Sequence, residues 1–217
     1  MNRIALLTHS VLPRGGVVHT LALADALVER GHDVTLIAPA EPGQTLFRTT
    51  RARTVLLPMP KPTGALVPQV RQRIDALARA LPPVLEAGRF DLLHAQDSLN
   101  GNALAELAER GVAPAPWVRT VHHLDDFEAP ELIAWQARGW QAADAIGCVS
   151  DLWQRHFEQV LGRSAQRLFN GVDLQRFTPT GTASRGDYLL AMGGVEARKN
   201  TPRLLAAFAA LRRDDPL

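Results

Sequence analysis

Several residue types that mark special environments are nearly missing from this chain. It contains one cysteine, Cys148, so an internal disulfide is excluded, and the apolar run around it is typical of a small buried side chain in a reducing compartment. No stretch approaches the roughly 20 apolar residues of a membrane-spanning helix. The N-terminus carries one early arginine and no cleavage-site pattern, so no signal peptide is expected. We therefore expect a cytoplasmic protein.

Lysine and tyrosine are scarce as well, with only Lys61, Lys199 and Tyr188 in the sequence. The sequence pI is 9.2 although the formal net charge is only +2, because almost nothing titrates between pH 7 and about 10. No basic run with interleaved aromatic residues occurs, so we expect no nucleic acid partner. The 217 residues, 46% hydrophobic and 21% charged, suit one large domain, or one domain and part of another.

Residues 1–38 predict a strand, a loop, a helix and a second strand. The apolar runs 4–8 and 34–38 have the length of strands, and the segment between them has helical periodicity from about Val17 until Gly31, where a left-handed residue ends it. Such a βαβ unit is right-handed and its strands are parallel. Its loop follows the first strand, on the side of the sheet where open α/β proteins bind ligands.

Two glycines, Gly15 and Gly16, end that loop. Because they lack a Cβ, a phosphate can come close to their N–H groups at the positive end of the helix. The alternative is that the pair only makes a tight turn. The glycines by themselves support both interpretations equally.

The alternation of strands and helices continues along the chain. Further strands are expected over residues 54–58, 91–95, 117–121, 145–149 and 166–169, and helices over 66–80, 99–109, 130–143 and 151–161. The first of these helices is expected to break at Pro82-Pro83. The pattern predicts a doubly wound, Rossmann-like α/β domain with a parallel sheet over residues 1–178.

A second, incomplete domain is expected after that. Residues 178–186 are small and polar, as in a linker, and are followed by an expected strand over 188–192 and a helix over 201–213. Four apolar side chains of this helix are expected to face inward, namely Leu204, Leu205, Phe208 and Leu211. A lone βα unit cannot cover both its faces, so we expect residues 179–217 to be the linker and first βα unit of a truncated domain.

Four stretches together resemble the retaining glycosyltransferases of the GT-B fold, in the group usually called family four. The stretches are residues 14–16 with 30–34, 118–122, 169–179 and 193–200. Such enzymes have two Rossmann-like domains that face a cleft. The first holds the acceptor, and the second holds most of a nucleotide-sugar donor. The resemblance implies hexosyl transfer from a nucleotide-sugar to an unknown glycosyl acceptor with retention, and no metal cofactor.

The resemblance also implies roles for residues of the first domain. Gly15 and Gly16 match the glycine loop whose backbone faces the donor diphosphate. His122 matches the histidine at a strand end that points into the cleft, near the acceptor and the transferred sugar.

In the second domain, Lys199 matches the lysine that neutralises the leaving diphosphate and so lowers the barrier to bond breaking. One departure is Gly194, where many members of the family have an arginine. Arg198, beside Lys199, would supply the missing cation and bind donor phosphate. Because the second domain is expected to be incomplete, we expect this chain alone to bind nucleotide-sugar weakly and to transfer nothing.

Other polar residues are candidates for the acceptor side. They are His19 in the first helix, and Asp97 and Asp126 at strand ends, each with a structural role as the alternative. The adjacent His122 and His123 suggest a metal site, but neighbouring strand residues point to opposite faces and no second cluster is spaced for ligation. No metal is therefore expected.

Three arginines in the irregular stretch after the second strand, Arg48, Arg51 and Arg53, suit an anionic acceptor or a peripheral contact with a membrane surface. A solvated loop is the favoured alternative.

Two other classes of function compete with sugar transfer. A non-catalytic Rossmann-like binding module is favoured by Gly194 and by the incomplete second domain. A nicotinamide-dependent dehydrogenase or epimerase needs G-x-G-x-x-G and an acidic residue at the end of the second strand. Here the loop reads Gly15-Gly16-Val17-Val18-His19, which does not fit this pattern, and the second strand is expected to end at Ala38-Pro39 without an acidic residue, so this class is disfavoured.

Overall fold

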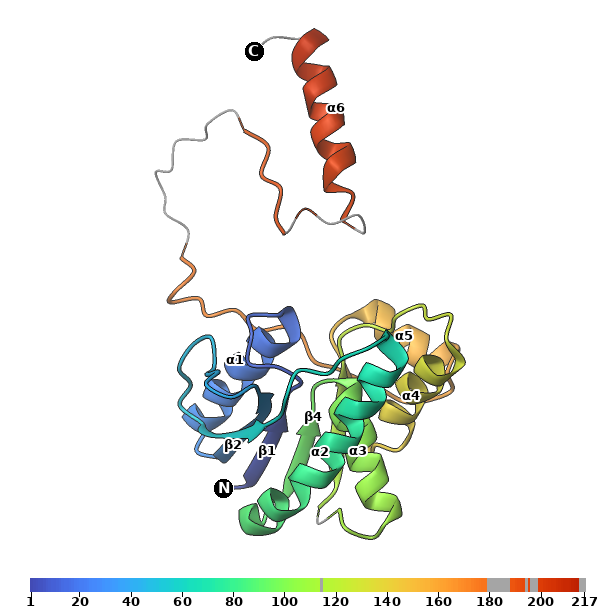
Figure 1. Ribbon diagram of the computed structural model, residues 1–217. Coiled ribbons are helices and arrows are strands. Elements are labelled where there is room, and N and C mark those ends of the chain that lie inside the picture. The colour runs from blue at the N-terminus through green and yellow to red at the C-terminus, as the bar shows by residue number, and fades with distance from the viewer. Residues whose placement is uncertain (114, 179–187, 194, 196–198, 215–217) are drawn as a thin grey trace. The chain divides into compact units, whose positions relative to one another are not determined.

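The computed structural model describes residues 1–113, 115–178, 188–193, 195 and 199–214 (Figure 1). The chain divides into two compact units, Met1–Arg176 and Phe177–Leu217. None of the helices in these described ranges is long and apolar enough to cross a membrane.

A seven-stranded parallel sheet forms the centre of the first unit. Its strands are β1 (Arg3–Leu7), β2 (Asp33–Ala40), β3 (Arg53–Pro58), β4 (Leu92–Ala95), β5 (Trp117–Val121), β6 (Ala145–Cys148) and β7 (Gln166–Arg167). They lie in the order β3-β2-β1-β4-β5-β6-β7, and every neighbouring pair is parallel. The order runs outward from β1 and β4, so the switch point of a doubly wound sheet lies between these two strands. The predicted fold class is confirmed.

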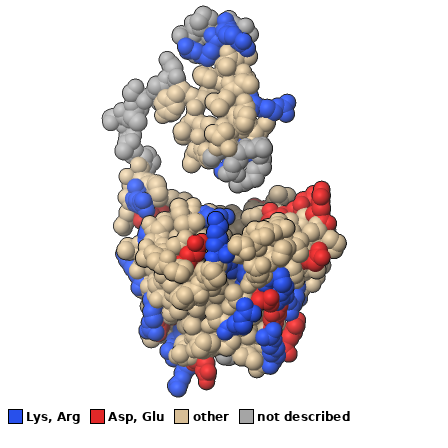
Figure 2. Space-filling view, viewed as in Figure 1, with Lys and Arg blue, Asp and Glu red and all other residues tan. Residues whose placement is uncertain are grey.

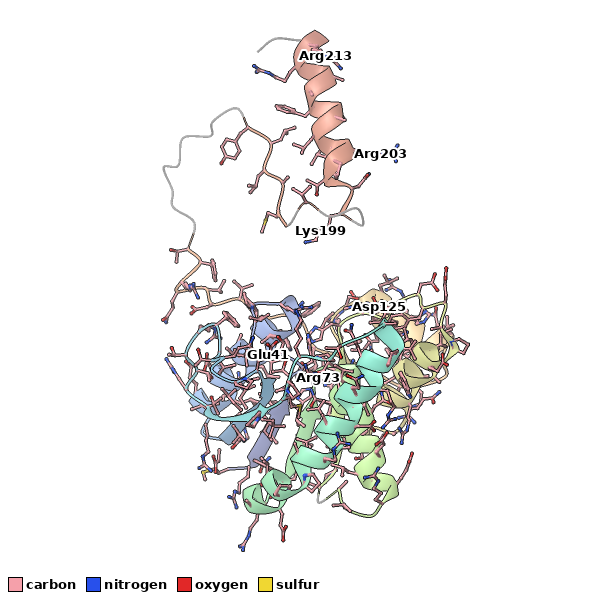
Figure 3. The ribbon with its side chains drawn as sticks, viewed as in Figure 1. Glu41, Arg73, Asp125, Lys199, Arg203 and Arg213 are labelled. Atoms are coloured by element: carbon pink, nitrogen blue, oxygen red, sulfur yellow. The ribbon has the colours of Figure 1, made fainter. Side chains whose placement is uncertain are left out.

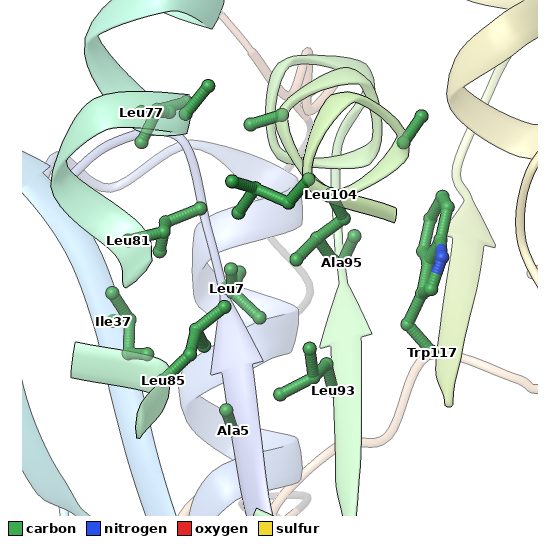
Figure 4. Packing of buried hydrophobic residues seen from close by; sticks show 14 of the residues in the cluster. Ala5, Leu7, Ile37, Leu77, Leu81, Leu85, Leu93, Ala95, Leu104 and Trp117 are labelled. Atoms are coloured by element: carbon green, nitrogen blue, oxygen red, sulfur yellow. The ribbon is translucent and has the colours of Figure 1, made fainter. Parts of the chain in front are cut away.

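Helices cover both faces of this sheet (Figure 1). They are α1 (Gly15–Glu29), α2 (Leu66–Gly88), α3 (Ser98–Glu109), α4 (Pro130–Gln141) and α5 (Asp151–Gln159). Alternate residues of β1 serve the two faces, as a pleated strand requires. Ile4 and Leu6 pack with Val17 and Leu21 of α1. Ala5 and Leu7 pack on the other face, with leucines of α2 and α3 (Figure 4).

Helix α2 passes through both prolines, so the expected break at Pro82-Pro83 is wrong. A proline inside a helix removes a backbone hydrogen bond, which favours a break. Here Leu81 and Leu85 stand one turn apart on either side of the prolines, and both are buried in the core. Burial of this stripe outweighs the lost hydrogen bonding, and α2 ends only at Arg89, which adopts the left-handed conformation.

One buried acidic residue joins the helices on the face of α2, α3 and α4. Three guanidinium groups form ion pairs with Glu106 of α3. The distance from the guanidinium nitrogen to the carboxylate oxygen is 2.6 Å for Arg71 of α2, 3.3 Å for Arg138 of α4 and 3.6 Å for Arg110. Arg71 and Arg138 donate to Oε1 of the carboxylate, whereas Oε2 has no hydrogen-bond partner among the described residues and faces Arg110 only through the ion pair. On the face shown in Figure 2, basic and acidic side chains lie interspersed over the first unit.

The second unit contains one helix among its described residues, α6 (Thr201–Asp214). The strand expected over 188–192 is not formed, and its four large apolar side chains, Tyr188, Leu189, Leu190 and Met192, are between 66% and 87% exposed. A strand needs a neighbour to take its backbone hydrogen bonds, and the described residues of this unit offer none. The four α6 side chains expected to face inward are likewise 38% to 56% exposed. The expected linker lies almost wholly outside the described residues.

Candidate functional site

Three adjacent central strands end on polar residues. β1 is followed by His9, β4 by Gln96 and Asp97, and β5 by His122. Parallel strands present their carboxyl ends at one edge of the sheet, and the switch point between β1 and β4 lies at this edge. The edge above β1, β4 and β5 is therefore the candidate site.

The glycine pair stands at the start of α1, beside this edge. α1 begins at Gly15, two residues earlier than expected, so both glycines belong to its first turn and not to the preceding loop. Arg14 makes no side-chain capping bond and the first turn holds no acidic residue, as is also true of α2, whereas Asp97 and Ser150 cap α3 and α5. The first N–H groups of a helix have no intrahelical partner, so α1 presents a positive end that suits an anion.

Gly16 lies directly against the imidazole of His122. A Cβ added to Gly16 would stand 3.6 Å from Cδ2 and 3.7 Å from Nε2 of that ring, whereas one added to Gly15 would meet nothing within 4 Å. His19, one turn along α1, contacts the same ring edge-on, with 5.0 Å between the ring centroids. The structure thus brings three of the predicted site residues, Gly16, His19 and His122, into one cluster beside Gly15.

The histidines of this cluster are held neutral. Burial lowers the pKa of His122 to about 4, helped by the positive charges of His19, Arg119 and His123 and opposed by Asp97. Burial also lowers the pKa of His19, and a side-chain hydrogen bond with Asn170 acts against it. A neutral imidazole has one N–H and one lone pair, so it can both donate a hydrogen bond and accept one.

A chain of hydrogen bonds leads from His122 into the protein. His122 Nε2 lies 3.3 Å from Gln96 Oε1, Gln96 Nε2 lies 3.0 Å from His94 Nε2, and His94 Nε2 lies 2.7 Å from Thr120 Oγ1. Gln96, His94 and Thr120 are all buried. Sequence reasoning assigned them no role. The signal for His94 is a titratable residue inside an apolar strand, and the signal for Gln96 is its place directly after that strand.

Arg119 of β5 is a second residue that sequence reasoning missed. It is 4% exposed, its Nη1 donates to the Thr120 carbonyl, and its Nη2 donates to Ser98 Oγ at 3.3 Å. Its Nε has no hydrogen-bond partner among the described residues. Burial lowers its pKa to about 10 and the charge of Asp97 opposes that change, so the guanidinium stays charged at neutral pH. This fixed cation beneath the site helps to keep His94 and His122 unprotonated.

The acidic candidates are placed differently from each other. Asp97 caps α3 by accepting from the backbone N–H of Asn100 at 2.9 Å and from its side chain at 2.7 Å, and it lies 3.7 Å from His9 Nδ1. Burial raises the pKa of Asp97, but the hydrogen bond and charge of His9, the charge of Arg119 and the Asn100 N–H together bring it below its ordinary value. Asp126 is exposed in the segment between β5 and α4.

The neighbouring histidines, which directly follow β5, differ in exposure. His122 is half-buried at the site, while His123 is exposed and lies 3.4 Å from Asp125. In the part of the chain that the structure describes, no three His, Cys, Asp or Glu side chains are grouped in a way that would hold a metal ion.

The arginines after β2 are occupied by acidic partners. Arg48 lies 2.8 Å from Asp25 of α1, Arg51 pairs with Glu29, and Arg53 lies 4.0 Å from Asp33. These ion pairs join residues 48–53 to α1 and to the start of β2, and they account for the three arginines without an anionic ligand.

The predicted donor-phosphate residues near the C-terminus belong to the second unit. Lys199 folds over the backbone of Gly193, where an added Cβ would meet Nζ at 2.6 Å. Gly193 has a φ of +110°, a conformation that glycine tolerates. Gly194 and Arg198 lie outside the described residues.

The end of β2 differs from the expectation in a way that bears on function. β2 extends to Ala40, so the acidic Glu41 follows it directly, where a nicotinamide-binding protein carries its ribose-binding carboxylate. Glu41 and Arg73 of α2 are labelled in Figure 3. Burial lowers the pKa of Arg73, and the charge of Glu41 opposes this change. An acidic residue thus follows β2, but the segment at the start of α1 still lacks the G-x-G-x-x-G pattern.

Residues 13–176 match the model of Glycosyltransferase Family 4, and the chain belongs to this family. It is 31% identical over 206 residues to the phosphatidyl-myo-inositol mannosyltransferase of Mycobacterium tuberculosis, covering 90% of this chain and 52% of that protein. It is also 31% identical over 211 residues to the protein of the same name from Mycolicibacterium smegmatis, covering 92% and 52%. The chain thus spans about half the length of the curated relatives it matches.

Solved structures show the same fold. Sucrose-phosphate synthase from Thermosynechococcus elongatus superposes with a TM-score of 0.68 at 16% identity, over 82% of this chain and 50% of that one. HepE from Anabaena, solved in complex with UDP and glucose, gives a TM-score of 0.57 at 19% identity, over 81% and 46%. The first unit is a Rossmann-like domain of the GT-B type, and the family resemblance seen in the sequence is confirmed.

Proposed function

We propose that this chain supplies the acceptor-side domain, residues 1–178, of a retaining glycosyltransferase that transfers a hexose from a nucleotide-sugar. Residues 179–217 then begin the donor-binding domain. Membership of Glycosyltransferase Family 4 supports the reaction class. The observation that carries the site assignment is the contact between His122 and Gly16, in a first helical turn that no side chain caps.

The chemistry follows from the groups at this edge. The free N–H groups of the first turn of α1 bind the donor diphosphate, and the absence of a Cβ at Gly15 and Gly16 lets it approach. When the bond to the sugar breaks, negative charge grows on the leaving diphosphate. N–H groups that are already fixed near that charge stabilise it and so lower the barrier. We assign the same role to Lys199 of the second domain. The neutral His122 hydrogen-bonds a hydroxyl group of the sugar or the acceptor.

The relatives suggest which substrates to test first. Two of them are named for mannosyl transfer to phosphatidyl-myo-inositol, and they match over nine-tenths of this chain. Mannose and an inositol phospholipid are therefore our first donor sugar and acceptor. The nicotinamide alternative is supported only by Glu41 and lacks the glycine pattern.

The experiment is a titration of the ¹⁵N-labelled chain with UDP-, GDP- and ADP-sugars, followed by amide NMR. We expect the largest shifts at the amides of Gly15 and Gly16 and at the ring of His122. Nucleoside monophosphates, which lack the diphosphate, are the matched ligand control. Saturable shifts that leave these three residues unaffected would contradict the site assignment. Mannosyl transfer to phosphatidylinositol vesicles, measured on the same chain and on a version carrying a complete second domain, separates an enzyme from a binding module.

A further inference from the structure

We propose that Gln96 is a positioning residue that fixes opposite tautomers in His94 and His122, so that His122 carries its proton on Nε2, on the ring edge that lies beside Gly16. This inference rests on the proposed function, because His122 Nε2 lies beside the first turn of α1, where the proposed function places the donor diphosphate, while the rest of the ring remains available to a hydroxyl group of the sugar or the acceptor. The tautomers themselves are a property of the chain without any ligand.

The amide of Gln96 has two different ends, and each end faces one histidine. Its Nε2, which can only donate, lies 3.0 Å from His94 Nε2. Its Oε1, which can only accept, lies 3.3 Å from His122 Nε2. His94 must therefore present a lone pair at Nε2, and His122 must present an N–H there. One side chain thus holds two neutral imidazoles in opposite proton arrangements.

Thr120 is compatible with this assignment at His94. Its hydroxyl, which can donate or accept, lies 2.7 Å from the same Nε2 and can donate to the lone pair that Gln96 requires there, so the His94 proton is assigned to Nδ1. Burial is also consistent with a neutral ring, since it lowers the pKa of His94 to about 4, with help from the charges of His19, Arg119 and His122. Gln96 has no freedom to leave this position, because it is 3% exposed.

The consequence at His122 concerns the ring edge that faces the glycine turn. Nε2 and Cδ2 are the ring atoms nearest to the place where a Cβ of Gly16 would stand, at 3.7 and 3.6 Å. A lone pair on that edge would repel a phosphate oxygen, whereas an N–H attracts it. The distance of 3.3 Å from Nε2 to Gln96 is long for an N–H···O bond, so the same proton can also be shared with an incoming anion.

Gln96→Met tests the proposal, because methionine has nearly the same length and neither end of the amide. Long-range ¹H–¹⁵N NMR of the histidine rings at pH 7 reads the tautomers directly. In the unmodified chain we expect Nε2–H at His122 and Nδ1–H at His94. In Gln96→Met we expect the ratio of Nε2–H to Nδ1–H at His122 to fall about fivefold, the equivalent of one hydrogen bond. Gln154→Met, which removes an amide from the exposed face of α5, should change neither ring.

A second variant guards against misfolding of the first. In Gln96→Glu the carboxylate accepts from both rings, so we expect His94 to move its proton to Nε2 while His122 keeps its own. A purely structural role for Gln96 would alter melting temperatures without this exchange. Nδ1–H at His122 in the unmodified chain, or an unchanged His122 ratio in Gln96→Met, would overturn the proposal.

Inorganic pyrophosphate separates this proposal from the proposed function. We expect it to bind the unmodified chain several-fold more tightly than Gln96→Met. If pyrophosphate and nucleotide-sugars do not bind at all, the donor site is wrong while the tautomer result still stands. If they bind but the tautomers are not opposite, the donor site stands and the role of Gln96 is refuted.

Discussion

A single methyl group on Gly15 or Gly16 distinguishes a ligand-binding role of these glycines from a structural one. Both lie in the helical first turn of α1, so alanine fits the backbone. A Cβ at Gly15 meets nothing within 4 Å, and a Cβ at Gly16 makes ordinary contacts of 3.6 and 3.7 Å with His122. Alanine reduces the freedom of the unfolded chain, which stabilises the folded state by about 0.4–1 kcal/mol. For a chain of this size the melting temperature should rise by about 1–4 °C.

Ligand binding should respond in the opposite direction. If a diphosphate approaches the N–H groups of the first turn, the added methyl group occupies the space it needs. We expect affinity for nucleotide-sugars and for pyrophosphate to fall at least tenfold, equivalent to about 1.4 kcal/mol. Calorimetric titration gives the affinity, and thermal unfolding of the same samples gives the stability.

Gly162→Ala is the matched control. Gly162 has a φ of +63° and open space around its Cβ position, so alanine there is strained by its backbone alone. We expect it to cost about 1–2 kcal/mol in stability and to leave ligand affinity unchanged. The reasoning is refuted if Gly15→Ala and Gly16→Ala both bind nucleotide-sugar as tightly as the unmodified chain.

Three further predictions concern the electrostatics and the core. Because the folded-state pKa values of His94 and His122 are about 4, below the ordinary 6.5, the free energy of unfolding should decrease as pH falls from about 6.5 to about 4; urea unfolding that is flat over this range would contradict it. Arg119→Met should raise the pKa of His94 toward its ordinary value by removing a buried cation, which an NMR titration would measure. An unchanged or lower pKa would show that the charge of Arg119 does not act on His94. Leu81→Ala should cost about 2–5 kcal/mol by urea unfolding, and a loss below 1 kcal/mol would mean that α2 does not depend on this contact.

Local pattern was sufficient to predict most of the first unit. The apolar run of β1, the apolar stripe of α1 and the left-handed Gly31 are set by neighbours in the sequence, and the structure has all three. The passage of α2 through Pro82 and Pro83 depends instead on the burial of Leu85 by distant strands, which no local rule contains. The strand expected over 188–192 is not formed for a related reason. An apolar sequence of strand type still needs a neighbouring strand to take its backbone hydrogen bonds.

In the candidate site too, some features could be predicted from sequence position and others depend on packing between distant segments. The place of His122 at the end of a parallel strand, together with the family resemblance, implied that it lies with Gly15 and Gly16, because parallel strands end at the same edge of the sheet. The chain from His122 through Gln96 to His94 depends on how β4 and β5 are aligned, and on side chains reaching between them. Arg119 was missed because an arginine within a strand is ordinarily exposed, and only the packed structure shows that it is buried.

The three arginines around Glu106 make the helical layer unequally tolerant of substitution. Loss of Arg71, Arg110 or Arg138 leaves the carboxylate with two cations, so each arginine can vary while the others remain. Loss of Glu106 removes the anion that α2, α3 and α4 share, and leaves Asp75 as the acidic partner of Arg71 and Glu109 as that of Arg138. Random mutagenesis with selection for folded protein should therefore recover substitutions at any one of the three arginines more often than at the glutamate.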